Sequence, residues 1–202
     1  MKVLFIGGTG NISTPCSRWA IEKGMDLYHL NRGLTGVEIP KVKTIIGDIN
    51  KPETLSELSK HTWDAVVNWI VFTPEEMQRD IELFKGKTKQ YIFISSASCY
   101  QTPLSYPIIT ESTPVCNTIW EYSNNKIKCE ELLMKAYREQ DFPFTIVRPS
   151  FTYDTIIPIA IGGVKEYTTA DRILKGQEII IHGDGTSVWV TTHADDFAVG
   201  LV

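Results

Sequence analysis

The fold is decided near the start of the chain, by Val3-Leu-Phe-Ile-Gly7-Gly8-Thr9-Gly10-Asn11-Ile12-Ser13. A short apolar run passes directly into a glycine-rich turn, and apolar residues at helical spacing follow. Gly7 and Gly10 suit a tight turn, because without a Cβ atom another group can approach the backbone closely. A phosphate above the turn would be held by N–H groups at the helix N-terminus. A plain turn would also contain such glycines, but this position between strand and helix predicts a dinucleotide site formed by Gly7, Gly10, Asn11 and Ile12.

Further apolar runs follow the first one at intervals long enough for a helix. The runs are continuous rather than alternating, which is typical of strands covered on both faces of a sheet. Strands that alternate with helices predict a parallel, doubly wound α/β sheet of the Rossmann type. We expect residues 1–150 to form this NAD(P)-binding domain, with strands at Val3–Ile6, Leu27–Leu30, Val42–Ile46, Ala65–Asn68, Tyr91–Ile94 and Phe144–Val147.

The pattern changes after residue 150. Residues 151–178 contain Pro158, Gly162-Gly163 and a helical stretch at Tyr167–Leu174, and we expect them to form part of a substrate-side segment. Residues 179–202 are expected to return to the Rossmann sheet. Strands are predicted at Glu178–Ile181 and Ser187–Thr192, around a turn at Gly183-Asp184-Gly185. A helix should then begin near His193, capped by Thr192 or Asp195. This pattern indicates a partial substrate-binding portion that has been truncated.

Composition excludes several classes of protein. The 202 residues are 43% hydrophobic and 22% charged, as in an ordinary globular domain, and the net charge of −4 argues against a general polyanion binder. No segment has the pattern of a signal peptide or the length of a membrane span. The histidines and cysteines show no metal-ligand spacing, so we expect no metal site, and a cytoplasmic protein with reduced, buried thiols at Cys16, Cys99, Cys116 and Cys129.

The ends of the second and third strands bear on the choice of cofactor. An acidic residue after the second strand would bind the adenosine ribose and disfavour a 2′-phosphate. The chain has Asn31 and Arg32 there, and an arginine can pair with a phosphate, so NADP is favoured over NAD. Asp48, followed by Ile49, could accept a hydrogen bond from the adenine amino group. The alternatives are a solvated Arg32 and a turn carboxylate at Asp48.

Tyr122-Ser-Asn-Asn-Lys126 places a tyrosine and a lysine four residues apart on a predicted helix. Cys129 and Leu133 continue the same stripe, so both polar side chains should point inward. An ammonium group near a phenol stabilises the phenolate, and we expect Lys126 to lower the pKa of Tyr122. Tyr122 then becomes a general base for an alcohol proton. The alternative is a packing tyrosine beside a lysine with a buried stem.

A hydroxyl-rich segment follows the fifth strand. Ser95, Ser96 and Ser98 stand at the carboxyl edge of the sheet, where ligands of open α/β sheets bind. A hydroxyl there can hold the reacting oxygen against Tyr122. The three serines compete for this role, and a simple serine-rich turn is the alternative.

These motifs together resemble those of the extended short-chain dehydrogenases, the NAD-dependent epimerase/dehydratase family. The paired motifs are Ile94-Ser-Ser-Ala-Ser-Cys-Tyr100 and Tyr122-Ser-Asn-Asn-Lys126, and Ser96 matches the family's catalytic Ser/Thr position. Arg148-Pro149-Ser150 resembles the segment beside the nicotinamide. His193-Ala194-Asp195-Asp196 resembles the late H-V-x-D element. The resemblance covers essentially the whole chain.

The resemblance implies an NAD(P)-dependent oxidoreductase that acts on a nucleotide sugar or a related alcohol. Ser96, Tyr122 and Lys126 would be catalytic, and Asn68 and Pro149 would join Tyr122 and Lys126 in the cofactor site. Ala97 and Ser98 stand where dehydratases have an acidic pair, which favours an epimerase or reductase. The family also implies a homodimer through the helices after strands four and five. Two departures are Ser13 in place of a third glycine, and Asn68-Trp69-Ile70 in place of a small-residue segment.

A second class of function also fits the resemblance. Within the family, Leu30-Asn31-Arg32-Gly33 and the segment from Arg148 to Asp154 resemble a subgroup related to chloroplast stem-loop RNA-binding proteins. A protein of that kind could keep the fold as an inactive nucleotide- or RNA-binding regulator. The intact Ser96, Tyr122 and Lys126, together with the acidic balance, favour the enzyme and make a nucleic-acid partner the weaker hypothesis.

Overall fold

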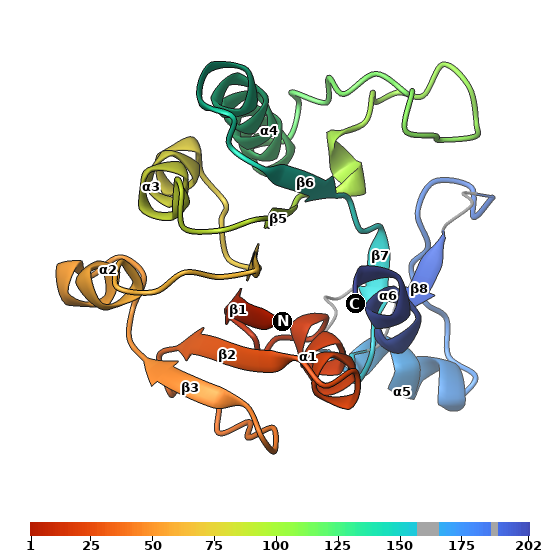
Figure 1. Cartoon of the computed structure of the whole chain (residues 1–202). Coiled ribbons are helices and arrows are strands. Elements are labelled where there is room, and N and C mark those ends of the chain that lie inside the picture. Colours follow the sequence, from red (N-terminus) through yellow and green to blue (C-terminus); the bar gives the residue numbers. More distant parts are fainter. Residues whose placement is uncertain (157–165, 187–189) are drawn as a thin grey trace.

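The computed structural model describes residues 1–156, 166–186 and 190–202, and Figure 1 shows their arrangement. Its centre is a six-stranded sheet in the order β3-β2-β1-β4-β5-β6, in which every pair of neighbours is parallel. The predicted doubly wound Rossmann-type sheet is thereby confirmed. The strands are β1 (Lys2–Ile6), β2 (Asp26–Asn31), β3 (Lys43–Ile46), β4 (Ala65–Asn68), β5 (Tyr91–Ile94) and β6 (Phe144–Val147).

Helices cover both faces of this sheet (Figure 1). One face packs against α2 (Pro52–Leu58), α3 (Pro74–Phe84) and α4 (Glu121–Gln140), and the other against α1 (Ser13–Glu22) and α6 (Ala194–Leu201). Successive residues of a strand point to opposite faces, so a strand between two helical layers must be apolar throughout. In β1, Leu4 and Ile6 join the first core while Val3 and Phe5 join the second.

Strand order reverses beside β1, because the chain builds outward from β1 through β2 to β3 and then returns to β4. Ligands of open α/β sheets bind in the crevice at this switch point, outside the carboxyl ends of the strands. The glycine-rich turn after β1 lies at that edge, as do the ends of β4 and β5. The fold therefore brings the predicted motifs to one side of the molecule.

The part of the chain after β6 differs from the prediction. β7 (Phe151–Tyr153) and β8 (Thr191–His193) pair as a separate two-stranded parallel sheet, so β8 does not return to the six-stranded sheet. The predicted strand at Glu178–Ile181 is wrong: the segment is irregular, and Ile180 is 77% exposed. α5 (Thr168–Leu174) matches the predicted helix. Pro158, Gly162-Gly163 and residues 187–189 lie outside the described residues.

The predicted caps of the last helix are corrected to His193. This residue has extended backbone angles directly before α6, and its Nδ1 accepts a hydrogen bond from the backbone N–H of Asp195 at 3.2 Å. Neither Thr192 nor Asp195 is the cap, because the helix begins between them at Ala194. Across the described parts of the chain, no helix combines the length and apolar character needed to cross a membrane.

Candidate active site

The turn after β1 depends on glycine at its first position. Gly7 has φ of +85°, in the left-handed region, and a Cβ atom there would lie 2.7 Å from Cγ2 of Ile70. Ser13 closes the turn, since its hydroxyl donates to the carbonyl of Gly7 (2.9 Å) and accepts from the N–H of Gly10 (2.8 Å). These two hydrogen bonds show how Ser13 stabilises the turn from the position where a third glycine is usual.

A first cavity of about 410 Å³ opens beside this turn, over the ends of β1, β2 and β3. Asp48 lies in its wall, and its Oδ1 accepts from the backbone N–H of Asn50 at 2.9 Å. Asp48 thus stabilises its own turn while it faces the cavity. Across the mouth, the Thr35 hydroxyl donates to that of Thr9 at 3.1 Å. The predicted residues that line this cavity are Gly7, Gly10, Asn31, Arg32, Asp48 and Ile49.

A second cavity of about 350 Å³ continues from the first toward β5 and α4. Gly7, Gly10, Ile70 and Phe72 line both cavities, so the two are joined at the glycine turn. Together they offer a mostly preformed site on the scale of a small-molecule pocket. The predicted residues that line the second cavity are Gly7, Gly10, Asn11, Ile12, Ser96, Tyr122, Lys126 and Pro149.

Ser96 and Tyr122 meet in this second cavity. Tyr122, half-buried near the start of α4, lines this cavity together with Ser96, and its ring contacts those of Trp120 and Phe72. Ser95 has a different partner, because its hydroxyl donates to Oε1 of buried Glu130 at 2.6 Å. The structure thus distinguishes the competing serines and puts Ser96 beside the phenol.

Lys126 points inward as predicted and is 2% exposed. Its Nζ donates to the carbonyls of Val71 (2.6 Å) and Ile94 (2.8 Å) and lies 4.8 Å from the ring centre of Phe93. Burial lowers the pKa of this ammonium group to about 8, because desolvation penalises the charged form. The lysine therefore ties the β4–α3 loop to the end of β5.

The expected lowering of the Tyr122 pKa by Lys126 is wrong. Burial raises this pKa, and the hydrogen bond with Ser96 opposes the rise. The ammonium of Lys126 bonds to backbone carbonyls, 5.7 Å from the centre of the Tyr122 ring, rather than to the phenol oxygen. The helical stripe predicts correctly which side of α4 Lys126 occupies. It cannot predict the hydrogen-bond partners of Lys126, because these come from two other segments of the chain.

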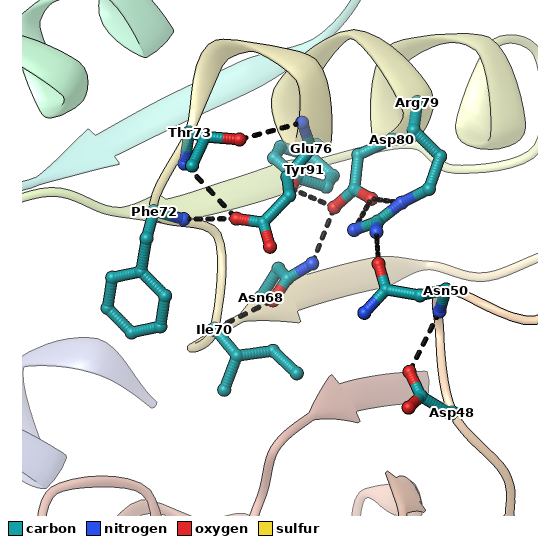
Figure 2. A network of polar contacts seen from close by, with 10 residues as sticks. All are labelled: Asp48, Asn50, Asn68, Ile70, Phe72, Thr73, Glu76, Arg79, Asp80 and Tyr91. Carbon is teal, nitrogen blue, oxygen red and sulfur yellow. Dashed lines mark hydrogen bonds and ion pairs between the residues drawn. The ribbon is translucent and has the colours of Figure 1, made fainter.

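A buried carboxylate behind the cavities organises their walls. Asp80 of α3 is fully buried and accepts hydrogen bonds from the Tyr91 hydroxyl (2.6 Å), the Asn68 amide and the Arg79 guanidinium (2.8 Å), as Figure 2 shows. Arg79 also donates to the side-chain oxygen of Asn50, next to the first cavity. A buried charge is stable only with several such donors. The network links α3 to the loops after β3 and β4.

The loop after β4 is held at both ends (Figure 2). The side-chain oxygen of Asn68 accepts from the N–H of Ile70 at 2.9 Å, and Glu76 accepts from the N–H groups of Phe72 and Thr73. Asn68 is completely buried and lines neither cavity, unlike every other residue predicted to bind the cofactor. Its contact with the site is indirect, through the position of Ile70.

Several residues of the cavity walls were missed from the sequence. Thr9, Ile70, Phe72 and Glu76 line the first cavity, and no motif in the sequence distinguishes them. Asp80 did leave a signal. It stands on the apolar stripe formed by Met77, Ile81 and Phe84, and a carboxylate at such a position requires buried partners.

Within the described ranges, no group of three His, Cys, Asp or Glu side chains is arranged to hold a metal ion. Cys16, Cys99 and Cys129 are buried free thiols, as expected, but Cys116 is exposed. Burial raises the pKa of Cys16 and Cys129 to about 12, so both are protonated at neutral pH.

The residues at the switch point fit a dinucleotide, because the two cavities meet at Gly7 and Gly10, directly before the start of α1. Fold and site together define a Rossmann-type protein of the extended short-chain dehydrogenase class. More specifically, the chain belongs to the NAD dependent epimerase/dehydratase family, whose family model matches residues 3–202.

Comparison with known proteins agrees with this membership. A UDP-glucose 4-epimerase from Lactobacillus helveticus is 28% identical over 169 residues, which are 73% of this chain and 51% of that protein. The chain therefore spans about half the length of this curated relative. Among solved structures, Pal from Bacillus thuringiensis has a TM-score of 0.79 at 20% identity, covering 98% of this chain and 72% of that one. The UDP-Glc/GlcNAc 4-epimerase from Campylobacter jejuni has a TM-score of 0.75 at 20% identity, with the same coverage.

Proposed function

We propose that this chain is the NAD(P)-binding and catalytic portion of a nucleotide-sugar epimerase. The observation that carries the proposal is the meeting of Ser96 and Tyr122 in a cavity continuous with the glycine turn. Family membership and the similarity to a UDP-glucose 4-epimerase support the same activity. These two side chains, with Lys126, also support an enzyme rather than an inactive regulator.

In this proposal each cavity would hold one half of the cofactor. Asn31, Arg32 and Asp48 would hold the adenosine in the first cavity, with the pyrophosphate over Gly7 and Gly10. Tyr122, Lys126 and Pro149 would lie around the nicotinamide end in the second cavity. When bound, NAD(P) supplies the chemistry of hydride acceptance and return.

Tyr122 acts as the base in this proposal. Its phenol oxygen takes the proton from a substrate hydroxyl and later returns it to the same oxygen, while the Ser96 hydroxyl orients the substrate. Because burial raises the pKa of Tyr122, the phenolate needs a hydrogen-bond donor, and the Ser96 hydroxyl in the same cavity would supply it. Ala97 and Ser98 provide no acidic group, which supports epimerase or reductase chemistry over dehydration.

We also propose a preference for NADP, a homodimer and a cytoplasmic location. The NADP preference is supported by Arg32, an exposed residue that lines the first cavity, because a guanidinium group can pair with a 2′-phosphate. α3 and α4, which follow β4 and β5 and pack together, would form the dimer interface, and light scattering of the purified protein tests this. The composition and the reduced thiols support the location.

Tyr122→Phe tests the proposed activity. In the purified protein we expect conversion of UDP-glucose to fall about 10³-fold, the scale of a lost general base. Tyr106→Phe is the matched control, since Tyr106 is exposed and lies outside both cavities. Unchanged turnover of Tyr122→Phe would exclude this phenol as the base. Mass spectrometry of nucleotide that co-purifies with the protein tests cofactor binding separately.

A further inference from the structure

A chain of serine hydroxyls leads from the interior of α4 to the phenol of Tyr122. Ser123 donates from its hydroxyl to that of Ser98 at 2.9 Å, and Ser98 donates from its hydroxyl to that of Ser96 at 2.9 Å. Ser96 in turn lines the same cavity as Tyr122, and its hydroxyl acts to lower the pKa of that phenol. The proposed function uses only the last two members of this chain.

The bonding of Ser96 determines where its own hydrogen points. A hydroxyl group has one hydrogen to donate and two lone pairs that accept. Both acceptor sites of Ser96 are used by Ser98, one by its hydroxyl and one by its backbone N–H at 3.2 Å. The hydrogen of Ser96 is therefore left to donate into the cavity that Tyr122 lines, to the phenol or to a substrate oxygen held beside it. A donor at this place stabilises a phenolate.

The first two members of the chain, Ser123 and Ser98, are fixed by the fold. Ser123 is completely buried on α4, one residue after Tyr122. Ser98 lies on the short helix η1 (Ala97–Cys99), and its carbonyl accepts from the Asn117 amide at 2.8 Å. The geometry therefore does not depend on a mobile side chain. Each hydroxyl that donates forward also polarises the next one, so the donor at the end is strengthened.

We propose that Ser98 and Ser123 are positioning residues that orient the Ser96 hydroxyl as a donor to Tyr122. Their catalytic meaning rests on the proposed function, but their effect on the phenol is a property of the folded chain alone. Other groups act on the same phenol: Cys99 on η1 and Lys126 on α4 are titratable, and Phe72 and Trp120 pack against the ring. Substitution of Ser98 or Ser123 changes none of these four residues.

The test is a titration of Tyr122 that needs no turnover. The chain has eight tyrosines, and labelling with 3-fluorotyrosine gives each a ¹⁹F signal while lowering the phenol pKa toward a range in which the protein stays folded. Tyr122→Phe assigns the signal. We expect Ser96→Ala to raise the pKa of Tyr122 by about one pH unit, Ser98→Ala by about half of that, and Ser123→Ala by less again.

Two further variants separate positioning from a general structural effect. Ser112→Ala removes an exposed hydroxyl pair with Thr110 (2.8 Å) and should leave the pKa of Tyr122 unchanged. Ser98→Thr keeps the hydroxyl and should restore the wild-type value. If Ser98→Ala and Ser123→Ala, folded by circular dichroism, titrate like the wild type, the proposal is overturned. If instead the variants shift the pKa of Tyr122 in the expected order but the protein shows no epimerase activity, only the proposed function is refuted.

Discussion

At the scale of single residues, His29 is a buried base beneath the glycine turn. It is 2% exposed, its Nε2 lies 2.8 Å from the Ser17 hydroxyl, and its ring stacks on Phe5. A Cβ atom on Gly8 would lie 2.4 Å from the imidazole, so ring and turn are in direct contact. Burial lowers the pKa of His29 from 6.5 to about 4, because the charged form would lose its hydration.

This depressed pKa predicts how stability depends on pH. Between pH 6.5 and 4 the unfolded chain binds a proton at His29 that the folded chain does not, so stability falls as pH falls through this window. The loss reaches about 3 kcal/mol for a shift of this size. Urea denaturation at several pH values measures it. The loss should be absent in His29→Gln and present in His182→Gln, which changes an exposed histidine; equal slopes in the two variants would contradict the prediction.

Arg32 allows the proposed cofactor preference to be tested at one exposed side chain. Arg32→Glu should weaken NADP binding by about 10- to 100-fold and leave NAD binding equal or stronger, because a carboxylate repels the 2′-phosphate but can accept from the ribose. Isothermal titration calorimetry with both nucleotides measures the two affinities. Arg18→Glu makes the same charge change at an exposed position of α1 outside the cavities. A wild type that prefers NAD, or equal losses for both nucleotides, would count against the preference.

At the scale of elements, α3 is held to the sheet by its buried carboxylate as well as by its apolar stripe. Replacing Asp80 with Asn should lower the free energy of unfolding by about 3 kcal/mol, since Arg79 and the Tyr91 hydroxyl then lose their charged acceptor. Denaturant unfolding measures the change. Asp171→Asn is the control, because it breaks only an exposed ion pair with Lys175 and should cost less than about 1 kcal/mol. A similar small loss for Asp80→Asn would show that the network adds little to stability.

The comparison of predicted and observed elements shows what local pattern can reach. Ala65–Asn68, Tyr91–Ile94 and Phe144–Val147 were predicted with the observed bounds, because a continuous apolar run between helices leaves few alternatives. Glu178–Ile181 is also mostly apolar but pairs with no strand among the described residues, and pairing partners are not encoded locally. Likewise the predicted site residues converge at one edge because parallel topology dictates it, whereas the partners of Lys126 depend on long-range packing.

At the scale of the whole molecule, the two joined cavities predict a graded response to nucleotides. ADP would contact the first cavity, whereas a complete dinucleotide would extend past the glycine turn into the second. A ligand that binds only the folded state stabilises it by RT ln(1 + [L]/Kd), so at equal concentrations NAD(P) should raise Tm more than ADP. Differential scanning fluorimetry with both ligands measures the two shifts.

Two substitutions and one control decide whether this difference between ADP and NAD(P) has the proposed structural origin. Gly7→Ala should remove the shifts from ADP and NAD(P) together, because its Cβ would meet Ile70 in the wall that both cavities share. Gly200→Ala, where a Cβ meets nothing within 4 Å, should keep both shifts. Lys126→Met should reduce the NAD(P) shift alone, because Lys126 lines only the second cavity. Equal losses for ADP and NAD(P) in Lys126→Met would mean that the dinucleotide does not extend along the two cavities, and the cofactor placement would have to be abandoned.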